Sequence, residues 1–232
     1  MGALDKLRRK LRPGLCDRVR ADRLTYLSIE KLEDLERLAA DVLAEQVPGM
    51  FVEAGVALGG ASIVVATRAR EQGRQFRGYD VFGQIPAPGE RDDEKSHARY
   101  EVIASGASGG LGGDDEYYGY RDDLLAVVTA TFARYDLQVD GTNVLLIEGL
   151  FEDTMSFKPD EQLAFVHVDC DWYEPVRYVL ETTYPALASG AVVIADDYHD
   201  YGGCRDACDE FVEAREDIKV VSTKGHLVMR RA

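Results

Sequence analysis

The chain has 232 residues, of which 46% are hydrophobic and 30% are charged, and its formal net charge is −15. This length suits one α/β domain with a sizeable core and is too short for two comfortable domains. A negative field repels phosphate backbones, so we expect no nucleic-acid partner, and no apolar run is long enough to suggest a membrane partner.

The first 49 residues precede the first expected strand. Residues 1–20 carry seven basic side chains, namely Lys6, Arg8, Arg9, Lys10, Arg12, Arg18 and Arg20. We interpret them as a solvated terminal helix, with a docking arm for an acidic partner, a second subunit or an anionic surface as the alternative. They lack the apolar core of a signal peptide, so we expect a cytoplasmic protein.

Residues 28–46 place apolar side chains at helical spacing, with Ser28 as N-cap and Pro48-Gly49 as the stop. We therefore expect residues 1–49 to form an N-terminal helical extension or lid. Its helices are also candidate contacts in a homo-oligomer.

From residue 50 onward, apolar strand patterns alternate with helix patterns. The expected strands are 50–54, 76–80, 143–148, 163–169 and 191–196, and the expected helices are 60–70, 122–135, 174–187 and 204–214. A closing hairpin is expected at 218–222 and 226–229, around Lys224-Gly225. This alternation predicts an α/β fold for residues 50–232, with a mostly parallel sheet, helices on both faces and an antiparallel edge.

The long connection between the second strand and the next helix spans residues 81–121. It contains Pro86, Pro88, a glycine-rich stretch at 105–113 and a tyrosine cluster at 117–120. An irregular segment of this length in a compact domain is usually functional or disordered. We expect it to act as an acceptor loop or lid.

Every expected core strand ends in a carboxylate, namely Glu53, Asp80, Glu148, Asp169 and Asp196-Asp197. The carboxyl ends of parallel strands meet at one edge of the sheet, where ligands bind. Carboxylates gathered there repel one another unless cations are present. A hard divalent metal on Asp169, Asp196 and Asp197 and the positive groups of S-adenosylmethionine would both satisfy this need.

The loop after the first strand contains Gly55 and Gly59-Gly60, which allow a ligand to approach the backbone. Its GxxxGG spacing differs from the GxGxxG fingerprint of dinucleotide-binding folds. Asp80 lies about 25 residues further on, a position that suits a carboxylate accepting the two ribose hydroxyls of either cofactor class.

The second half of the chain contains the more specific motifs. Asp169-Cys-Asp171-Trp172-Tyr173-Glu174 follows the fourth strand, and Asp196-Asp197-Tyr198 follows the fifth. Glu148-Gly149-Leu150-Phe151-Glu152-Asp153-Thr154 precedes them. Together these motifs resemble the macrocin O-methyltransferase family, metal-dependent enzymes of antibiotic biosynthesis that methylate sugar hydroxyls of macrolides and related natural products.

The resemblance extends from about Met50 to the C-terminus and implies a Rossmann-like class I methyltransferase of seven strands. It implies Mg²⁺ on Asp169, Asp196 and Asp197, with Asp171 as general base and Asp169 also in the catalytic group. It places S-adenosylmethionine at Glu53, Gly55, Ser62, Asp80, Glu148, Asp153 and Asp169. The glycine-rich stretch and His226 depart from the family pattern near the acceptor, which leaves open a small-molecule acceptor other than a macrolide sugar.

Other interpretations remain open at this point. A metal-independent methyltransferase fits the same fold. An NAD(P)-dependent oxidoreductase would need a glycine fingerprint and a catalytic Tyr/Lys or Ser pair, and the sequence shows neither. A non-catalytic scaffold with this fold would lack the metal carboxylates, and all of them are present. His167 is expected in the core or its flank, and His199 near the metal. Cys204, Cys208 and His199 could bind a soft metal, but buried thiols are the expected interpretation.

Overall fold

The computed structural model describes residues 13–112 and 115–232. Seven strands form one sheet in the order β3-β2-β1-β4-β5-β7-β6. They are β1 (Met50–Ala54), β2 (Phe76–Asp80), β3 (Val144–Glu148), β4 (Leu163–Val168), β5 (Leu187–Ala195), β6 (Ile218–Ser222) and β7 (Leu227–Arg231). The first five strands are parallel, and β7 pairs antiparallel with both β5 and β6. The expected fold class and closing hairpin are confirmed.

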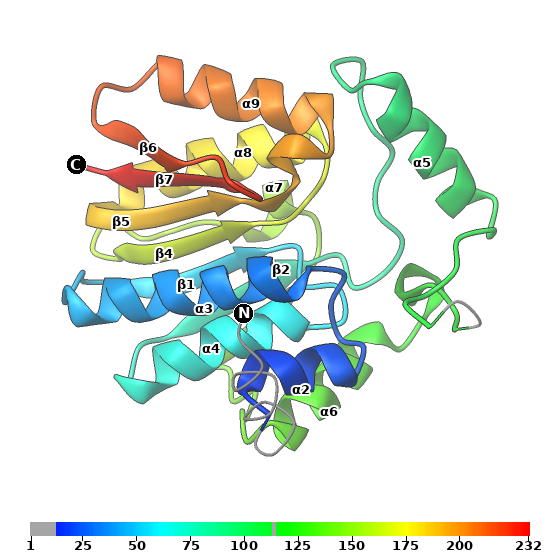
Figure 1. Cartoon of the computed structure of the whole chain (residues 1–232), viewed down its shortest axis with the longest axis horizontal. Helices are drawn as coiled ribbons and strands as arrows, with labels where there is room; N and C mark the ends of the chain where they lie inside the picture. The colour runs from blue at the N-terminus through cyan, green and yellow to red at the C-terminus, as the bar shows by residue number, and fades with distance from the viewer. Residues whose placement is uncertain (1–12, 113–114) are drawn as a thin grey trace, which may run out of the picture.

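Helices cover both faces of this sheet (Figure 1). In chain order they are α2 (Leu15–Ala21), α3 (Ile29–Ala44), α4 (Gly60–Glu71), α5 (Glu94–Ala104), α6 (Leu124–Arg134), α7 (Phe151–Thr154), α8 (Tyr173–Thr183) and α9 (Gly202–Glu213). In Figure 1, α8 and α9 lie together on one side and α3 and α4 on the other. None of the described helices is long and apolar enough to cross a membrane.

The central strands are apolar on both faces because helices cover both faces of a parallel sheet. Every residue of β1 and β4 is buried. Phe51 and Phe165, paired in adjacent strands, stack with ring centres 5.4 Å apart. This rigid centre fixes the carboxyl ends of the strands, where the candidate site residues lie.

Two expected boundaries differ from the structure by about one helical turn. The helix expected at 174–187 ends at Thr183, and β5 begins at Leu187 rather than at residue 191. Pro185 has no backbone N–H, so a single 3₁₀ turn replaces the last helical turn. Gly190, at φ +83°, lies where the register between β4 and β5 shifts, so the strand continues through a stretch that resembles a loop in sequence.

The segment 81–121 is more regular than expected, because it contains α5 and a 3₁₀ turn at Tyr118–Tyr120. Asp93 caps α5 by accepting the backbone N–H of Ser96 at 2.9 Å. Asp92 accepts the N–H of Tyr173 at 2.8 Å, and Asp93 accepts that of Gly202 at 2.8 Å. The start of α5 is thus tied to the starts of α8 and α9, while the rest of the helix stands beyond the sheet (Figure 1).

Candidate active site

A cavity of about 900 Å³ lies beyond the carboxyl ends of the parallel strands. Its wall combines the loop before α3, the loops after β1 and β2, helix α5, helix α7 and the segments after β4 and β5. Of the site residues expected from the sequence, Gly55, Asp80, Asp153, Asp169, Asp171, Asp196 and Asp197 line it. The structure therefore brings four of the strand-end carboxylates, Asp80, Asp169, Asp196 and Asp197, around a single space.

Asp169, Asp196 and Asp197 approach one another closely enough to share an ion, with one carboxylate oxygen from each within 4.8 Å of the others. Burial and then repulsion from neighbouring carboxylates raise the pKa of both Asp169 and Asp197 well above the usual value. The Oδ1 atom of Asp196 is buried and accepts no hydrogen bond from the described residues. A divalent cation would satisfy this oxygen and relieve the repulsion, so the residues present fit such an ion.

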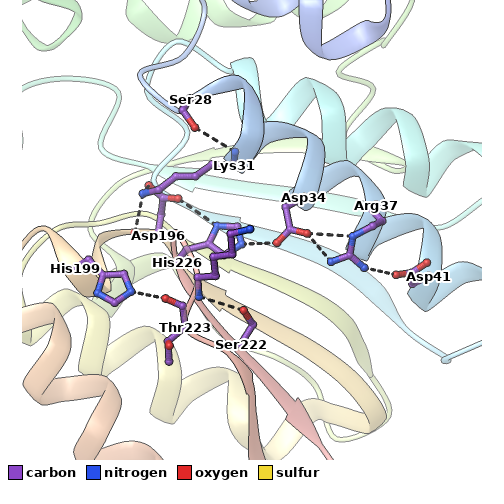
Figure 2. Close-up of polar contacts among 11 residues, drawn as sticks. Ser28, Lys31, Asp34, Arg37, Asp41, Asp196, His199, Ser222, Thr223 and His226 are labelled. Carbon is purple, nitrogen blue, oxygen red and sulfur yellow. Dashed lines mark hydrogen bonds and ion pairs between the residues drawn. The ribbon is translucent and has the colours of Figure 1, made fainter. Parts of the chain in front are cut away.

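Asp196 also has two partners from distant parts of the chain, a lysine and a histidine (Figure 2). The Nζ atom of Lys31, on α3, lies 3.0 Å from Asp196 Oδ2, and His226 Nδ1 lies 3.6 Å from Asp196 Oδ1. Burial alone would raise the pKa of Asp196, but His226, His167 and Lys31 outweigh it and lower that pKa. The second nitrogen of His226 contacts Asp34 on α3 at 3.0 Å. Helix α3 is thus bonded directly to a member of the carboxylate cluster.

Asp171 lies just past β4 in a backbone conformation that is uncommon for a residue with a side chain, at φ +61°. Its N–H donates to Asp197 Oδ2 at 3.1 Å, which fixes it beside the carboxylate cluster. Burial raises the pKa of Asp171 to about 7, although Arg99 acts in the opposite direction. A carboxylate with a pKa near neutrality is suited to accept a proton from a hydroxyl group.

Asp80 organises the loops that frame the other half of the cavity. Its Oδ2 accepts the N–H groups of Val56 and Ala57 at 2.7 and 2.8 Å, and its Oδ1 accepts that of Phe82 at 2.7 Å. Burial nevertheless raises the pKa of Asp80. One side chain therefore joins the glycine loop after β1 to the loop after β2.

Both the backbone conformation and the close packing at position 55 require a glycine. At φ +94°, a Cβ atom would lie 1.7 Å from the carbonyl oxygen of Asp169. The loop after β1 thus passes directly against the backbone of Asp169, a member of the carboxylate cluster.

Three residues expected at the cofactor lie outside the cavity wall. Glu53 and Ser62 are fully buried, where Ser62 donates to Glu53 Oε2 and His167 Nδ1 lies 2.6 Å from Glu53 Oε1. Glu148 is exposed at the end of β3. Glu53 and Ser62 therefore support β1, α4 and β4 from within the core, and His167 is the core histidine that was expected.

Aromatic side chains form much of the remaining wall, including Tyr117, Tyr118 and Trp172. Trp172 is buried and donates its indole N–H to the carbonyl oxygen of Pro86 at 2.9 Å, while Tyr173 contacts Glu210 away from the cavity. Two of the three tyrosines in the 117–120 cluster thus face the cavity, whereas Tyr120 donates to the Ile103 carbonyl at 2.6 Å.

His199, expected near the metal, is exposed and contacts the Thr223 carbonyl oxygen at 2.5 Å (Figure 2). All four cysteines are buried free thiols. Of the basic N-terminal side chains, Lys6 to Arg12 lie outside the described residues, and Arg20 donates to the Leu27 carbonyl at 2.6 Å.

Sequence reasoning missed Lys31, His226 and Arg99. Their sequence signals were weak: Lys31 is one of many charges on an amphipathic helix, and Arg99 lies in a segment expected to be irregular. His226 stood out only as a departure from the family pattern.

The family model described as macrocin-O-methyltransferase (TylF) matches residues 9–107 and 115–225. The demethyldecarbamoylnovobiocin O-methyltransferase of Streptomyces niveus is 33% identical over 202 residues, which cover 84% of this chain and 69% of that protein. The mycinamicin III 3''-O-methyltransferase of Micromonospora griseorubida is 31% identical over 204 residues, covering 85% and 72%.

The solved structure of the O-methyltransferase NovP superposes with a TM-score of 0.72 at 27% identity, covering 90% of this chain and 81% of that one. These matches exclude an NAD(P)-dependent oxidoreductase. The chain belongs to the macrocin O-methyltransferase family and is an O-methyltransferase.

Proposed function

We propose that this enzyme transfers the methyl group of S-adenosylmethionine to a sugar hydroxyl of a glycosylated natural product, with Mg²⁺ held by Asp169, Asp196 and Asp197. The observation that carries the proposal is the convergence of these three carboxylates within 4.8 Å in the wall of the large cavity. Carboxylate oxygens are the ligands that Mg²⁺ prefers. The two relatives are named for O-methylation of demethyldecarbamoylnovobiocin and of mycinamicin III, which supports the acceptor class.

When bound, Mg²⁺ would stabilise the negative charge that develops on the acceptor oxygen, and S-adenosylmethionine would supply an activated methyl group. Asp171 accepts the hydroxyl proton at its carboxylate, and its backbone bond to Asp197 holds it beside the metal cluster. Gly55, Asp80 and Asp153, which all line the cavity, form the surface for the adenosyl cofactor. Glu53 and Ser62 support this surface from within the core. Glu148 is exposed outside the cavity wall and takes no part in binding.

A metal-independent methyltransferase is the second candidate, because Lys31 already supplies positive charge to Asp196. Isothermal titration of chelator-treated protein separates the two. S-adenosylmethionine and S-adenosylhomocysteine should bind and NADH should not. Mg²⁺ should bind with one site per chain and should be required for turnover. Full turnover in excess chelator would favour the second candidate, and no adenosyl binding under any metal condition would reject both.

A further inference from the structure

Helix α5 presents two cations to the cavity that form no ion pair with a described carboxylate. Lys95 and Arg99 lie one turn apart, and both line the cavity. Lys95 donates to the backbone carbonyl of Asp200, and its Nζ lies 4.9 Å from the centre of the Tyr201 ring. The guanidinium of Arg99 lies 5.6 Å from the centre of the Tyr117 ring. Within residues 13–112 and 115–232, neither side chain has an ion-pair partner.

In this respect Lys95 and Arg99 differ from Lys31, the other cation of the cavity wall. Acidic residues outnumber basic ones by 42 to 27, so carboxylate partners are plentiful. The third cation in the cavity wall, Lys31, pairs with Asp196 and Asp200, and the half-buried Arg77 pairs with Glu161. The Arg99 guanidinium is half-buried in the cavity wall and forms no ion pair or hydrogen bond with the described residues, so its donors are available for a ligand.

We propose that Arg99, with Lys95 beside it, forms an anion-binding subsite and that the acceptor carries a negatively charged group next to the sugar. The inference rests on the proposed function and names a property of its acceptor. Two kinds of acceptor have this chemistry: a nucleotide-linked sugar with its phosphates, and a glycoside whose aglycone is ionised. The rings of Tyr117 and Tyr201 flank the two cations and offer a base or an aromatic aglycone a surface to stack on.

The subsite belongs to the acceptor side of the cavity rather than to the adenosyl cofactor. Arg99 and Lys95 come from the 81–121 segment, and their aromatic neighbours come from that segment and from the turn before α9. The loop that accommodates the cofactor in the proposed function comes from β1 and is tied to Asp80. The carboxylate of the cofactor is nevertheless an anion, so the experiment includes a cofactor arm.

The test is titration calorimetry on the full chain saturated with S-adenosylhomocysteine and Mg²⁺, using three rhamnosides. Phenyl α-L-rhamnoside is neutral, 4-carboxyphenyl α-L-rhamnoside carries an aglycone anion, and thymidine diphosphate-L-rhamnose carries phosphates. We expect at least one charged rhamnoside to bind about tenfold or more tightly than the neutral one, as expected for a charge-assisted hydrogen bond. Which of the two is favoured identifies the source of the anion.

The variant Arg99→Met should remove this preference while leaving the affinity for S-adenosylhomocysteine and phenyl rhamnoside unchanged. Arg99→Lys should retain part of it, because the charge remains but the planar fork of donors is lost. Lys219→Met, at an exposed position in β6, is the matched control for loss of one positive charge and should keep the preference.

The proposal is overturned if the charged rhamnosides bind no more tightly than the neutral one, or if none of the three binds. It is also overturned if Arg99→Met weakens S-adenosylhomocysteine instead, because Arg99 would then serve the cofactor carboxylate. Failure of the proposed function gives a different result, namely no binding of S-adenosylhomocysteine by the unsubstituted chain.

Discussion

The ammonium nitrogen of Lys31 lies 3.0 Å from Asp196 Oδ2, although the two residues are 165 positions apart in sequence. Burial alone would lower the pKa of Lys31, but Asp196 and Asp200 outweigh it and raise that pKa, so the side chain stays charged. The N-terminal helix α3 therefore supplies a fixed positive charge to a proposed metal ligand (Figure 2).

Replacing Lys31 with Met should tighten Mg²⁺ and Mn²⁺ binding by about tenfold or more, because the ammonium group repels a divalent ion sharing Asp196. Calorimetric titration of the metal into chelator-treated protein measures this directly. Lys95→Met is the matched control, since Lys95 also lines the cavity but bonds a backbone carbonyl. An unchanged or weakened metal affinity in Lys31→Met would contradict the prediction.

Asp169→Asn should give a protein that melts at a higher temperature than the unsubstituted chain when both are metal-free. The substitution removes a buried charge from a cluster of like charges. The same variant should lose the thermal stabilisation by Mg²⁺ and the metal-dependent turnover. Asp196→Asn should also lose turnover while remaining folded. Normal activity in either variant would refute the metal assignment.

The stability of the metal-free protein should fall as the pH rises from about 4 to about 7. Asp171 has a folded pKa of about 7, above its usual value, so in this range the folded chain binds more protons than the unfolded chain. Such a group favours folding below the unfolded pKa, and this contribution is lost as the pH rises through the folded pKa. The raised pKa values of Asp169 and Asp197 act in the same direction.

Denaturant titrations at several pH values, with and without Mg²⁺, measure this effect. Saturating Mg²⁺ should flatten the pH dependence, because the ion stabilises the charged carboxylates of the folded state. A metal-free protein whose stability increased steadily over this range would be inconsistent with the buried carboxylate cluster.

Asp171→Asn should lower kcat by about 10² to 10⁴, the usual contribution of a general base. Asparagine tolerates the positive φ of this position, so the backbone should be retained. Affinities for Mg²⁺ and S-adenosylhomocysteine should change little, and calorimetry on the same preparation provides the control. Turnover at the original rate would remove Asp171 from the mechanism.

Gly55→Ala should destabilise the protein by about 2 kcal/mol or more, because the new methyl group meets the Asp169 carbonyl as well as an unfavourable φ. Gly73→Ala is the matched control, since Gly73 has φ +63° and open space around its Cβ position. Its expected cost is only about 1 kcal/mol, from backbone strain alone. Equal denaturation midpoints for the two variants would show that the contact is unimportant.

The sequence predicted the fold and the centre of the site because both depend on local patterns. Apolar strands alternating with helices imply a parallel sheet, and the carboxyl ends of such strands meet at one edge. The order of the strands and their acidic ends were therefore enough to place Asp169, Asp196 and Asp197 together. Helix α5 was missed because few of its side chains are buried, so it lacks a strong amphipathic pattern.

Lys31 and His226 could not be predicted as neighbours of Asp196 for a different reason. Their placement depends on how α3 packs across the sheet and on the turn between β6 and β7. Glu53 and Ser62 illustrate a different limit of sequence reasoning. Both lie on the elements next to the site, but their side chains point into the core, a direction that strand-end position alone does not determine.

The attachment of α5 has an evolutionary consequence. Asp92 and Asp93 fasten the start of this helix to α8 and α9, whereas Lys95 and Arg99 lie further along it, on the cavity wall. Substitutions on that wall can change which molecule is accepted without disturbing the strand-end carboxylates. Under the proposed function, substitutions in α5 would therefore let a lineage of such enzymes change its acceptor while keeping its reaction.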